Sequence, residues 1–140
     1  MTRYLVLTLA VLLSAGCGLQ AQSDRPETQP GLKAASDWLA QMDTGNYTGT
    51  WQSAAAYFRA AVPQEQWVSS LNAFRIPMGA KVSRVVKSAR LVTTLPGAPD
   101  GQYVLIEYRT AFANKKEAIE TATVMRETGG VWRVSGYFIR

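Results

Sequence analysis

The chain of 140 residues contains no histidine and a single cysteine, Cys17. The absence of histidine excludes a Ser-His-Asp triad, a Cys-His pair, a His-ligated zinc site and a haem with a proximal histidine. One cysteine can form neither an intramolecular disulfide nor a four-cysteine iron–sulfur site. We therefore expect no metal and no cofactor. Any enzyme built on this chain would work with carboxylates, lysine, arginine, tyrosine or serine.

The chain also lacks a hydrophobic run long enough to cross a bilayer. The run from Leu5 to Leu13 is about half of the roughly 20 residues that a membrane-spanning helix needs. It follows the positively charged Arg3 and precedes the small residues Ala15 and Gly16. This pattern predicts an export signal peptide over residues 1–16 with a small-residue cleavage site.

Cys17 stands directly after this segment. Leu13–Cys17 resembles the bacterial lipobox, with Ser14 where that motif usually has leucine. The resemblance implies lipidation of Cys17, by more than one acyl chain and therefore with stable membrane anchoring. Residue 18 is glycine and not the aspartate that usually retains such lipoproteins at the inner membrane. The resemblance therefore implies an outer-membrane location that faces the periplasm. The alternative is an ordinary secretory signal cut near residue 16 or 21, which would give a soluble periplasmic or secreted protein.

The segment after the cysteine is almost free of apolar side chains and contains Pro26 and Pro30. We therefore expect residues 17–30 to comprise the lipidated cysteine and an extended, disordered tether. The remaining residues, 31–140, have the size of one ordinary domain.

This domain divides into a helical half and a strand half. Apolar residues at helical spacing predict helices over about 31–43 and 49–62, and a third that runs from Pro63 until Pro77 and Gly79 stop it. Runs of β-branched and aromatic residues predict strands over about 82–95, 102–112, 117–127 and 131–139. Short connections imply an antiparallel meander. Helices followed by strands imply an α+β fold with helices on one face of the sheet.

Several short segments occur in a characteristic order. They are Trp38-Leu39, Phe58-Arg59, Glu65-Gln66-Trp67, the turn Leu95 to Gly101, Tyr108-Arg109-Thr110 and the ending Val131 to Ile139. In these segments the chain resembles the bacterial domain of unknown function 4019 family over about residues 31–140. That family has no assigned activity. The resemblance implies N-terminal helices packed on a curved four-stranded antiparallel sheet, like the nuclear transport factor 2-like or cystatin-like cone, with a pocket or a dimer face.

Six strand residues are candidates for such a pocket or interface: Glu107, Tyr108, Arg109, Glu120, Arg133 and Tyr137. If residues 114–115 form a two-residue turn, Arg109 lies opposite Glu120, and a cross-strand ion pair there would help to set the register. The alternative is catalytic, with Glu107 or Glu120 as base and Arg109 and Tyr137 as donors. Strand alternation predicts that Trp132, Val134 and Phe138 face the helices and that Arg133, Ser135 and Tyr137 line the opposite face.

The formal net charge is +5, and five basic residues lie close together in sequence: Arg75, Lys81, Arg84, Lys87 and Arg90. We expect these residues to belong to an ordinary solvated strand. The alternative is a basic patch that binds anionic lipids or cell-wall polymers. We expect no nucleic acid partner.

The sequence as a whole predicts a non-catalytic ligand-binding or protein-interaction module of the cell envelope. Its partners would be the membrane, through the lipid on Cys17, and an envelope protein or a small ligand. One alternative is a small metal-free enzyme that uses a pocket carboxylate. Another is a homodimer through the open sheet face, with Tyr108, Arg133 and Tyr137 at the contact.

Overall fold

The computed structural model describes residues 24–140. The expected signal peptide, Cys17 and the first part of the expected tether lie outside the described residues. Helical structure begins with a 3-10 turn, η2 (Pro26–Thr28), within the segment assigned to the tether, and Thr28 is buried. Between residues 24 and 140, no helix is long and apolar enough to cross a membrane.

The first long helix, α1 (Gln29–Asp43), buries one apolar stripe that includes Ala35, Leu39 and Met42. The spacing of these residues places them on one face of the helix, as predicted. Gly45 follows with a φ of 79°, in the left-handed region that favours glycine, and its N–H donates to the Met42 carbonyl. This glycine ends the helix at the expected place.

The predicted single helix over 49–62 is wrong, because two short helices replace it: α2 (Tyr47–Gln52) and α3 (Ala56–Ala61). Between them the N–H of Ala55 donates to the carbonyl of Val134 at 2.8 Å. That bond to the sheet takes a backbone donor away from helical pairing. Asn46 caps α2 through its side-chain oxygen, which accepts from the N–H of Gly49 at 3.0 Å.

The third predicted helix is confirmed as α4 (Gln64–Phe74), with Pro63 at its N-cap and a short 3-10 turn, η3 (Ile76–Met78), after it. Its buried Trp67 donates from Nε1 to the Thr50 hydroxyl at 3.0 Å. This bond joins α4 to α2 in the interior of the molecule.

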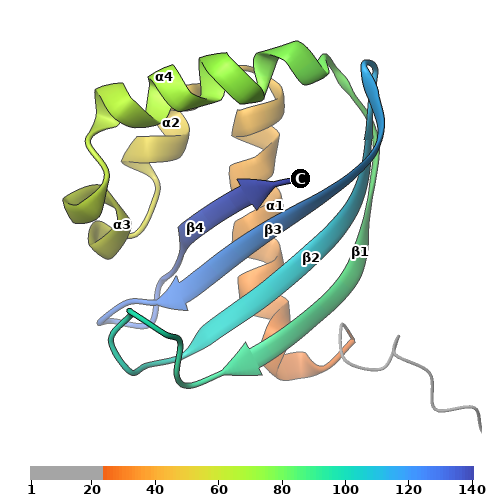
Figure 1. Cartoon of the computed structure of the whole chain (residues 1–140). Helices are drawn as coiled ribbons and strands as arrows, with labels where there is room; N and C mark the ends of the chain where they lie inside the picture. Colours follow the sequence, from red (N-terminus) through yellow and green to blue (C-terminus); the bar gives the residue numbers. More distant parts are fainter. Residues whose placement is uncertain (1–23) are drawn as a thin grey trace, which may run out of the picture.

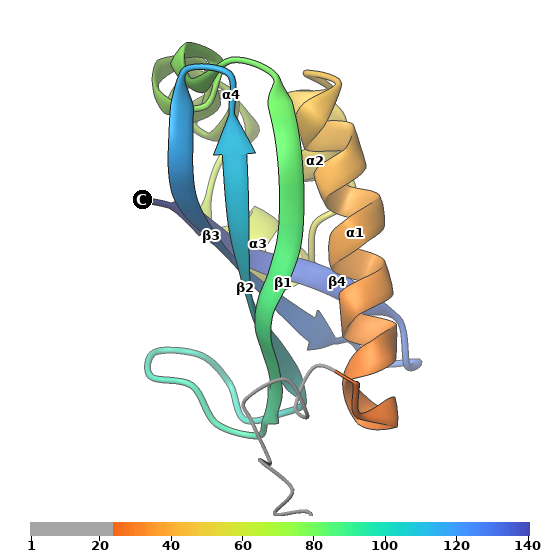
Figure 2. The same cartoon turned by 90° about the vertical axis from the view of Figure 1, so that its right-hand side faces the viewer.

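Four antiparallel strands follow in the order β1-β2-β3-β4: β1 (Lys81–Val92), β2 (Tyr103–Phe112), β3 (Lys115–Arg126) and β4 (Trp132–Ile139). Figure 1 shows α1 behind the sheet and α4 across one end of it, and Figure 2 shows α1 alongside β1. The predicted α+β class and the meander are therefore confirmed. The nuclear transport factor 2-like cone stays a prediction.

Bulges in β1 and β4 reverse the alternation of the faces of these strands. In β1 the pairing with β2 skips Lys87, and in β4 the pairing with β3 skips Ser135. An extra residue turns every following side chain to the other face. The predicted alternation of β4 is therefore wrong beyond Val134: Tyr137 packs into the core, whereas Phe138 is 55% exposed.

Aromatic rings join the helices to the sheet. The ring of Tyr137 lies 5.3 Å from that of Trp38 and 6.5 Å from that of Trp67, between centroids. Phe58 meets Trp67 edge-on at 5.1 Å. These contacts give the core a rigid end beside the polar cluster described below.

Candidate functional site

Glu120 is a carboxylate in the middle of the inner face of the sheet. It lies on β3 between Ala118 and Ala122, which face the core, and it is completely buried. Taking an ionised carboxylate out of water is costly unless hydrogen bonds and opposite charges compensate. The surroundings of Glu120 provide both kinds of compensation.

Four hydrogen bonds converge on the two oxygens of Glu120. Its Oε1 accepts from the Thr110 hydroxyl at 2.5 Å and from Nε of Arg84 at 2.7 Å. Its Oε2 accepts from Nη2 of Arg84 at 3.2 Å and from the Tyr137 hydroxyl. These donors fill the lone-pair positions of a carboxylate. Glu120 therefore has no oxygen position left for a proton from a substrate.

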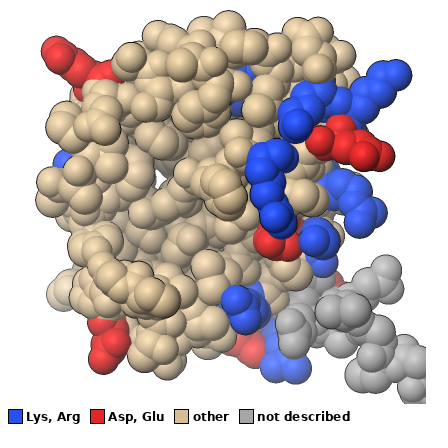
Figure 3. Space-filling model, viewed as in Figure 1, with Lys and Arg blue, Asp and Glu red and all other residues tan. Residues whose placement is uncertain are grey.

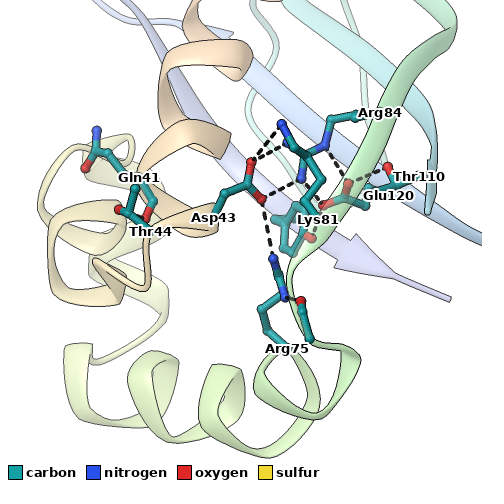
Figure 4. A network of polar contacts seen from close by, with 10 residues as sticks. Gln41, Asp43, Thr44, Arg75, Lys81, Arg84, Thr110 and Glu120 are labelled. Atoms are coloured by element: carbon teal, nitrogen blue, oxygen red, sulfur yellow. Dashed lines mark hydrogen bonds and ion pairs between the residues drawn. The ribbon is translucent and has the colours of Figure 1, made fainter. Parts of the chain in front are cut away.

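Arg84 links Glu120 to a second carboxylate, Asp43, at the C-terminal end of α1. Its Nη1 and Nη2 donate to the two oxygens of Asp43 at 2.7 and 2.9 Å. The planar guanidinium suits this geometry, because one edge meets each carboxylate. Figure 4 shows Arg84 between Asp43 and Glu120. The Arg84 side chain is only 10% exposed.

Two further cations surround Asp43. Arg75 donates to it at 3.4 Å, and Nζ of Lys81 lies 3.8 Å from its Oδ2. Arg75 also donates to the carbonyl of Gly79 at 2.7 Å and lies over the ring of Phe112 at 4.4 Å. We call this set the polar cluster; its members are Asp43, Arg75, Lys81, Arg84, Thr110, Glu120 and Tyr137.

The protonation states of Arg84 and Tyr137 are fixed by their neighbours. Burial alone lowers the pKa of Arg84, but its hydrogen bonds to Asp43 and Glu120 outweigh burial and raise the pKa above its ordinary value. Burial and the charge of Glu120 raise the pKa of the Tyr137 hydroxyl. Arg84 therefore stays charged and Tyr137 stays protonated, so neither group takes up or releases a proton near neutral pH.

A cleft of about 520 Å³ lies beside the polar cluster, between α1 and β1, which run side by side in Figure 2. Leu32, Leu39 and Val86 give it apolar walls, and Asp43, Lys81, Arg84 and Tyr108 also line it. Tyr108 is 5% exposed, and its buried hydroxyl has no hydrogen-bond partner among the described residues. Apolar walls with a few polar groups are typical of small-molecule sites.

A second cleft, of about 360 Å³, lies on the other side of α1, against β4. Trp38, Trp132 and Arg133 line it. Nε of Arg133 forms an ion pair with Oε1 of Glu127 at 2.7 Å, and no ion pair or hydrogen bond between the described residues joins Arg133 to the polar cluster. The structure thus separates Arg133 from Tyr108, Glu120 and Tyr137.

The expected pairing of Arg109 with Glu120 is wrong, because Tyr108 lies opposite Glu120 and Arg109 lies opposite Ile119. The hairpin turns one residue earlier than expected, with Phe112 paired to Lys115, and the register shifts between Thr110 and Phe112. A change of one residue in register exchanges the two faces of a strand.

Glu107 and Arg109 consequently lie on the outer face of the sheet. Glu107 is 34% exposed and pairs with Lys87 at 3.2 Å and Arg140 at 3.9 Å. Arg109 is exposed. Of the six candidates, Tyr108, Glu120 and Tyr137 come together on the inner face, and Glu107, Arg109 and Arg133 do not join them.

The sequence reasoning did not assign site roles to Asp43, Arg84 or Thr110. A signal was present for Asp43, which continues the buried stripe of α1 four residues after Leu39. Arg84 was counted among five neighbouring basic residues, of which Arg75 is in fact buried and Arg84 nearly so. The bulges in β1 hide its inward direction from simple alternation.

Within residues 24–140, no group of three or more cysteine or acidic side chains is placed to hold a metal ion. The polar cluster consists of paired charges that are hydrogen-bonded to one another. The arrangement can hold α1 against the sheet and can present hydrogen-bond donors to the cleft.

Comparison with known proteins assigns a family to most of the chain. No curated protein and no solved structure matches the chain. Residues 34–137 match the family model described as a protein of unknown function (DUF4019). The match confirms the family resemblance and runs from α1 to β4, so it contains every member of the polar cluster. The chain belongs to the DUF4019 family.

Proposed function

We propose that this protein is a non-catalytic binding module of the cell envelope, exported by residues 1–16 and held at the outer membrane by lipidated Cys17. The export signal and the lipobox-like segment support the anchored location. The folded domain supports the binding role, because it combines a cleft with a polar cluster in which Glu120 is fully hydrogen-bonded and Arg84 stays charged.

The observation that carries this proposal is the state of Glu120. A general base needs an oxygen within reach of the proton that it removes. Each oxygen of Glu120 already accepts two hydrogen bonds, and one bond to each oxygen comes from the positively charged Arg84. The other carboxylate proposed as a base, Glu107, is on the outer face with Lys87. This arrangement favours binding over catalysis.

The first experiment is the native mass of the protein, gently extracted with detergent from the membranes of its own cells. We expect a mass that begins at Cys17 with its acyl groups, together with an additional non-covalent mass that disappears on denaturation. A Cys17→Ala variant is the matched control and should be found in the soluble fraction. A lipid-free mass that begins elsewhere would contradict the anchor, and the absence of any bound molecule or protein would contradict the binding role.

A further inference from the structure

The cleft between α1 and β1 contains an unsatisfied donor. The Tyr108 hydroxyl is shielded from solvent and bonds to no described atom. A buried hydroxyl without a partner is destabilising compared with one that is bonded. Burial raises the pKa of Tyr108 to about 12, so the hydroxyl keeps its proton at neutral pH and can donate it to an acceptor.

Two cations, Lys81 and Arg84, line the same cleft. The bonds of Arg84 to Asp43 and Glu120 leave one N–H of Nη1 unused among the described residues. Lys81 is loosely paired to Asp43 at 3.8 Å, and its side chain is 39% exposed. Three groups that can donate hydrogen bonds, from Lys81, Arg84 and Tyr108, thus line one cleft.

The balance of charge in the polar cluster favours an anion. Its three cations, Arg75, Lys81 and Arg84, face only two carboxylates, Asp43 and Glu120. Asp43 also lines the cleft, but both its oxygens accept from Arg84. One positive charge in this partly buried place has no matching negative charge within the cluster, and a bound anion would supply it.

Part of the remaining lining of the cleft is apolar, and Gln29, Lys33 and Ser36 add polar groups from α1. Leu32 and Leu39 from α1 face Val86 from β1, and the volume of about 520 Å³ lies in the range of small-molecule sites. A free inorganic anion would leave these walls in contact with water. A ligand with an apolar part would cover them.

We infer that this cleft binds a small amphipathic monocarboxylate. Its carboxylate accepts hydrogen bonds from Tyr108, Arg84 and Lys81, and its hydrocarbon part lies between α1 and β1. The inference rests on the proposed function, since it names the ligand class of the same binding module.

The test is calorimetric titration of the purified protein with octanoate, with octylamine as the probe of opposite charge. We expect octanoate to bind and octylamine not to bind. Tyr108→Phe should weaken octanoate binding about tenfold or more, the effect of one hydrogen bond to a charged group. Tyr103→Phe on the same strand is the matched control, because its hydroxyl donates to the Pro99 carbonyl outside the cleft.

A second pair of variants tests the charge. Lys81→Gln should weaken octanoate binding, whereas Lys87→Gln, on the same strand but paired with Glu107, should leave it unchanged. Thermal unfolding of the free Tyr108→Phe protein should show undiminished stability, because the lost hydroxyl had no partner. A purely structural hydroxyl would instead lower the unfolding temperature.

Absence of octanoate binding, equal binding of octylamine, or binding that Tyr108→Phe leaves unchanged would overturn the carboxylate inference. The native mass separates this failure from failure of the proposed function. A bound molecule of another class would leave the binding module standing without its carboxylate ligand. Absence of any bound molecule or protein would contradict both the carboxylate inference and the proposed binding function.

Discussion

Arg84 connects three parts of the chain that are far apart in the sequence. It lies on β1 and bonds to Asp43 at the end of α1 and to Glu120 on β3. Buried ion pairs often contribute little net stability compared with a well-packed apolar core. Removal of one partner is nevertheless costly, because the remaining charge stays buried without compensation.

We therefore predict that Arg84→Ala lowers the free energy of unfolding by about 3–5 kcal/mol. The change leaves Glu120, which is completely buried, without its cation. Urea unfolding followed by circular dichroism measures the loss. Arg90→Ala, at an exposed position of the same strand, should change stability by no more than about 0.5 kcal/mol. A loss below about 1 kcal/mol for Arg84→Ala would show that water reaches Glu120.

The two inner tyrosines predict a loss of stability in alkali. Burial raises the pKa of Tyr108 to about 12 and raises that of Tyr137 as well, whereas an unfolded tyrosine ionises near its ordinary value of 10.0. Above about pH 10 the unfolded chain therefore binds fewer protons than the folded one. Stability is complete below this pH and falls as pH rises, by about 1.4 kcal/mol per pH unit for each such tyrosine.

Urea unfolding between about pH 8 and 11 measures this slope. Tyr108→Phe should reduce the slope without lowering stability at neutral pH. Tyr137→Phe should reduce the slope and also lower stability at neutral pH, because its hydroxyl donates to Glu120. Slopes equal to that of the unmodified protein in both variants would contradict the assignment.

At the residue scale, the sequence was a partial guide to the site. Tyr108, Glu120 and Tyr137 were named together as candidates, because polar groups in an apolar strand pattern are conspicuous. The structure brings these three side chains to the inner face of the sheet, and their role in a site stays a prediction. The cation that pairs with Glu120 was not predicted. The expected partner, Arg109, lies on the outer face, because the register of β2 and β3 differs from the expected one. Contacts such as Arg84 to Asp43 join separate elements, and no local pattern encodes them.

At the scale of elements, Gly31 brings α1 close to Val104 of β2. A Cβ atom on Gly31 would lie 2.6 Å from Cγ2 of Val104. Both residues are buried, and the Val104 side chain occupies the space that a side chain at position 31 would need. Glycine here sets the distance between helix and sheet.

Gly31→Ala should therefore destabilise the protein, although alanine is the better helix former by about 1 kcal/mol. We expect a net loss of about 1–3 kcal/mol from overpacking. Thermal unfolding measures it, and Ser36→Ala, at an exposed position of the same helix, serves as the control. In the double variant with Val104→Ala the two losses should be less than additive, because the smaller side chain removes the clash.

Element types were largely predictable, and their interruptions were not. Helical periodicity identified α1 and α4, and runs of β-branched and aromatic residues identified the four strands. The break between α2 and α3 depends on a hydrogen bond from Ala55 to Val134, which is distant in the sequence. The bulge at Ser135 likewise depends on pairing with β3.

At the scale of the whole molecule, charge is unevenly distributed. Figure 3 shows Lys and Arg gathered over the β1 side of the molecule, while much of that face carries neither sign of charge. The same side contains the mouth of the cleft, whose lining includes Lys81 and Arg84. An anionic ligand would thus approach along a positively charged surface.

The folded unit also extends beyond its expected N-terminal boundary at residue 31. Thr28 is buried, and its N–H and hydroxyl donate to the carbonyl of Arg25 at 3.0 and 2.8 Å. We predict that a chain that begins at Asp24 unfolds at the same temperature as the longer one. A chain that begins at Gly31 should lose about 1–2 kcal/mol, or several degrees in calorimetry. Equal unfolding temperatures for the two would restore the boundary at residue 31.

The long sequence separations within the polar cluster have a consequence for folding kinetics. The β1-β2-β3-β4 meander can form hairpin by hairpin from neighbouring segments. The Arg84 bonds to Glu120 and Asp43 instead span 36 and 41 positions of the chain. We expect them to form after the transition state. Weakening these bonds would then accelerate unfolding and leave the folding rate almost unchanged. The polar cluster would therefore slow the unfolding of the protein without helping its sheet to form.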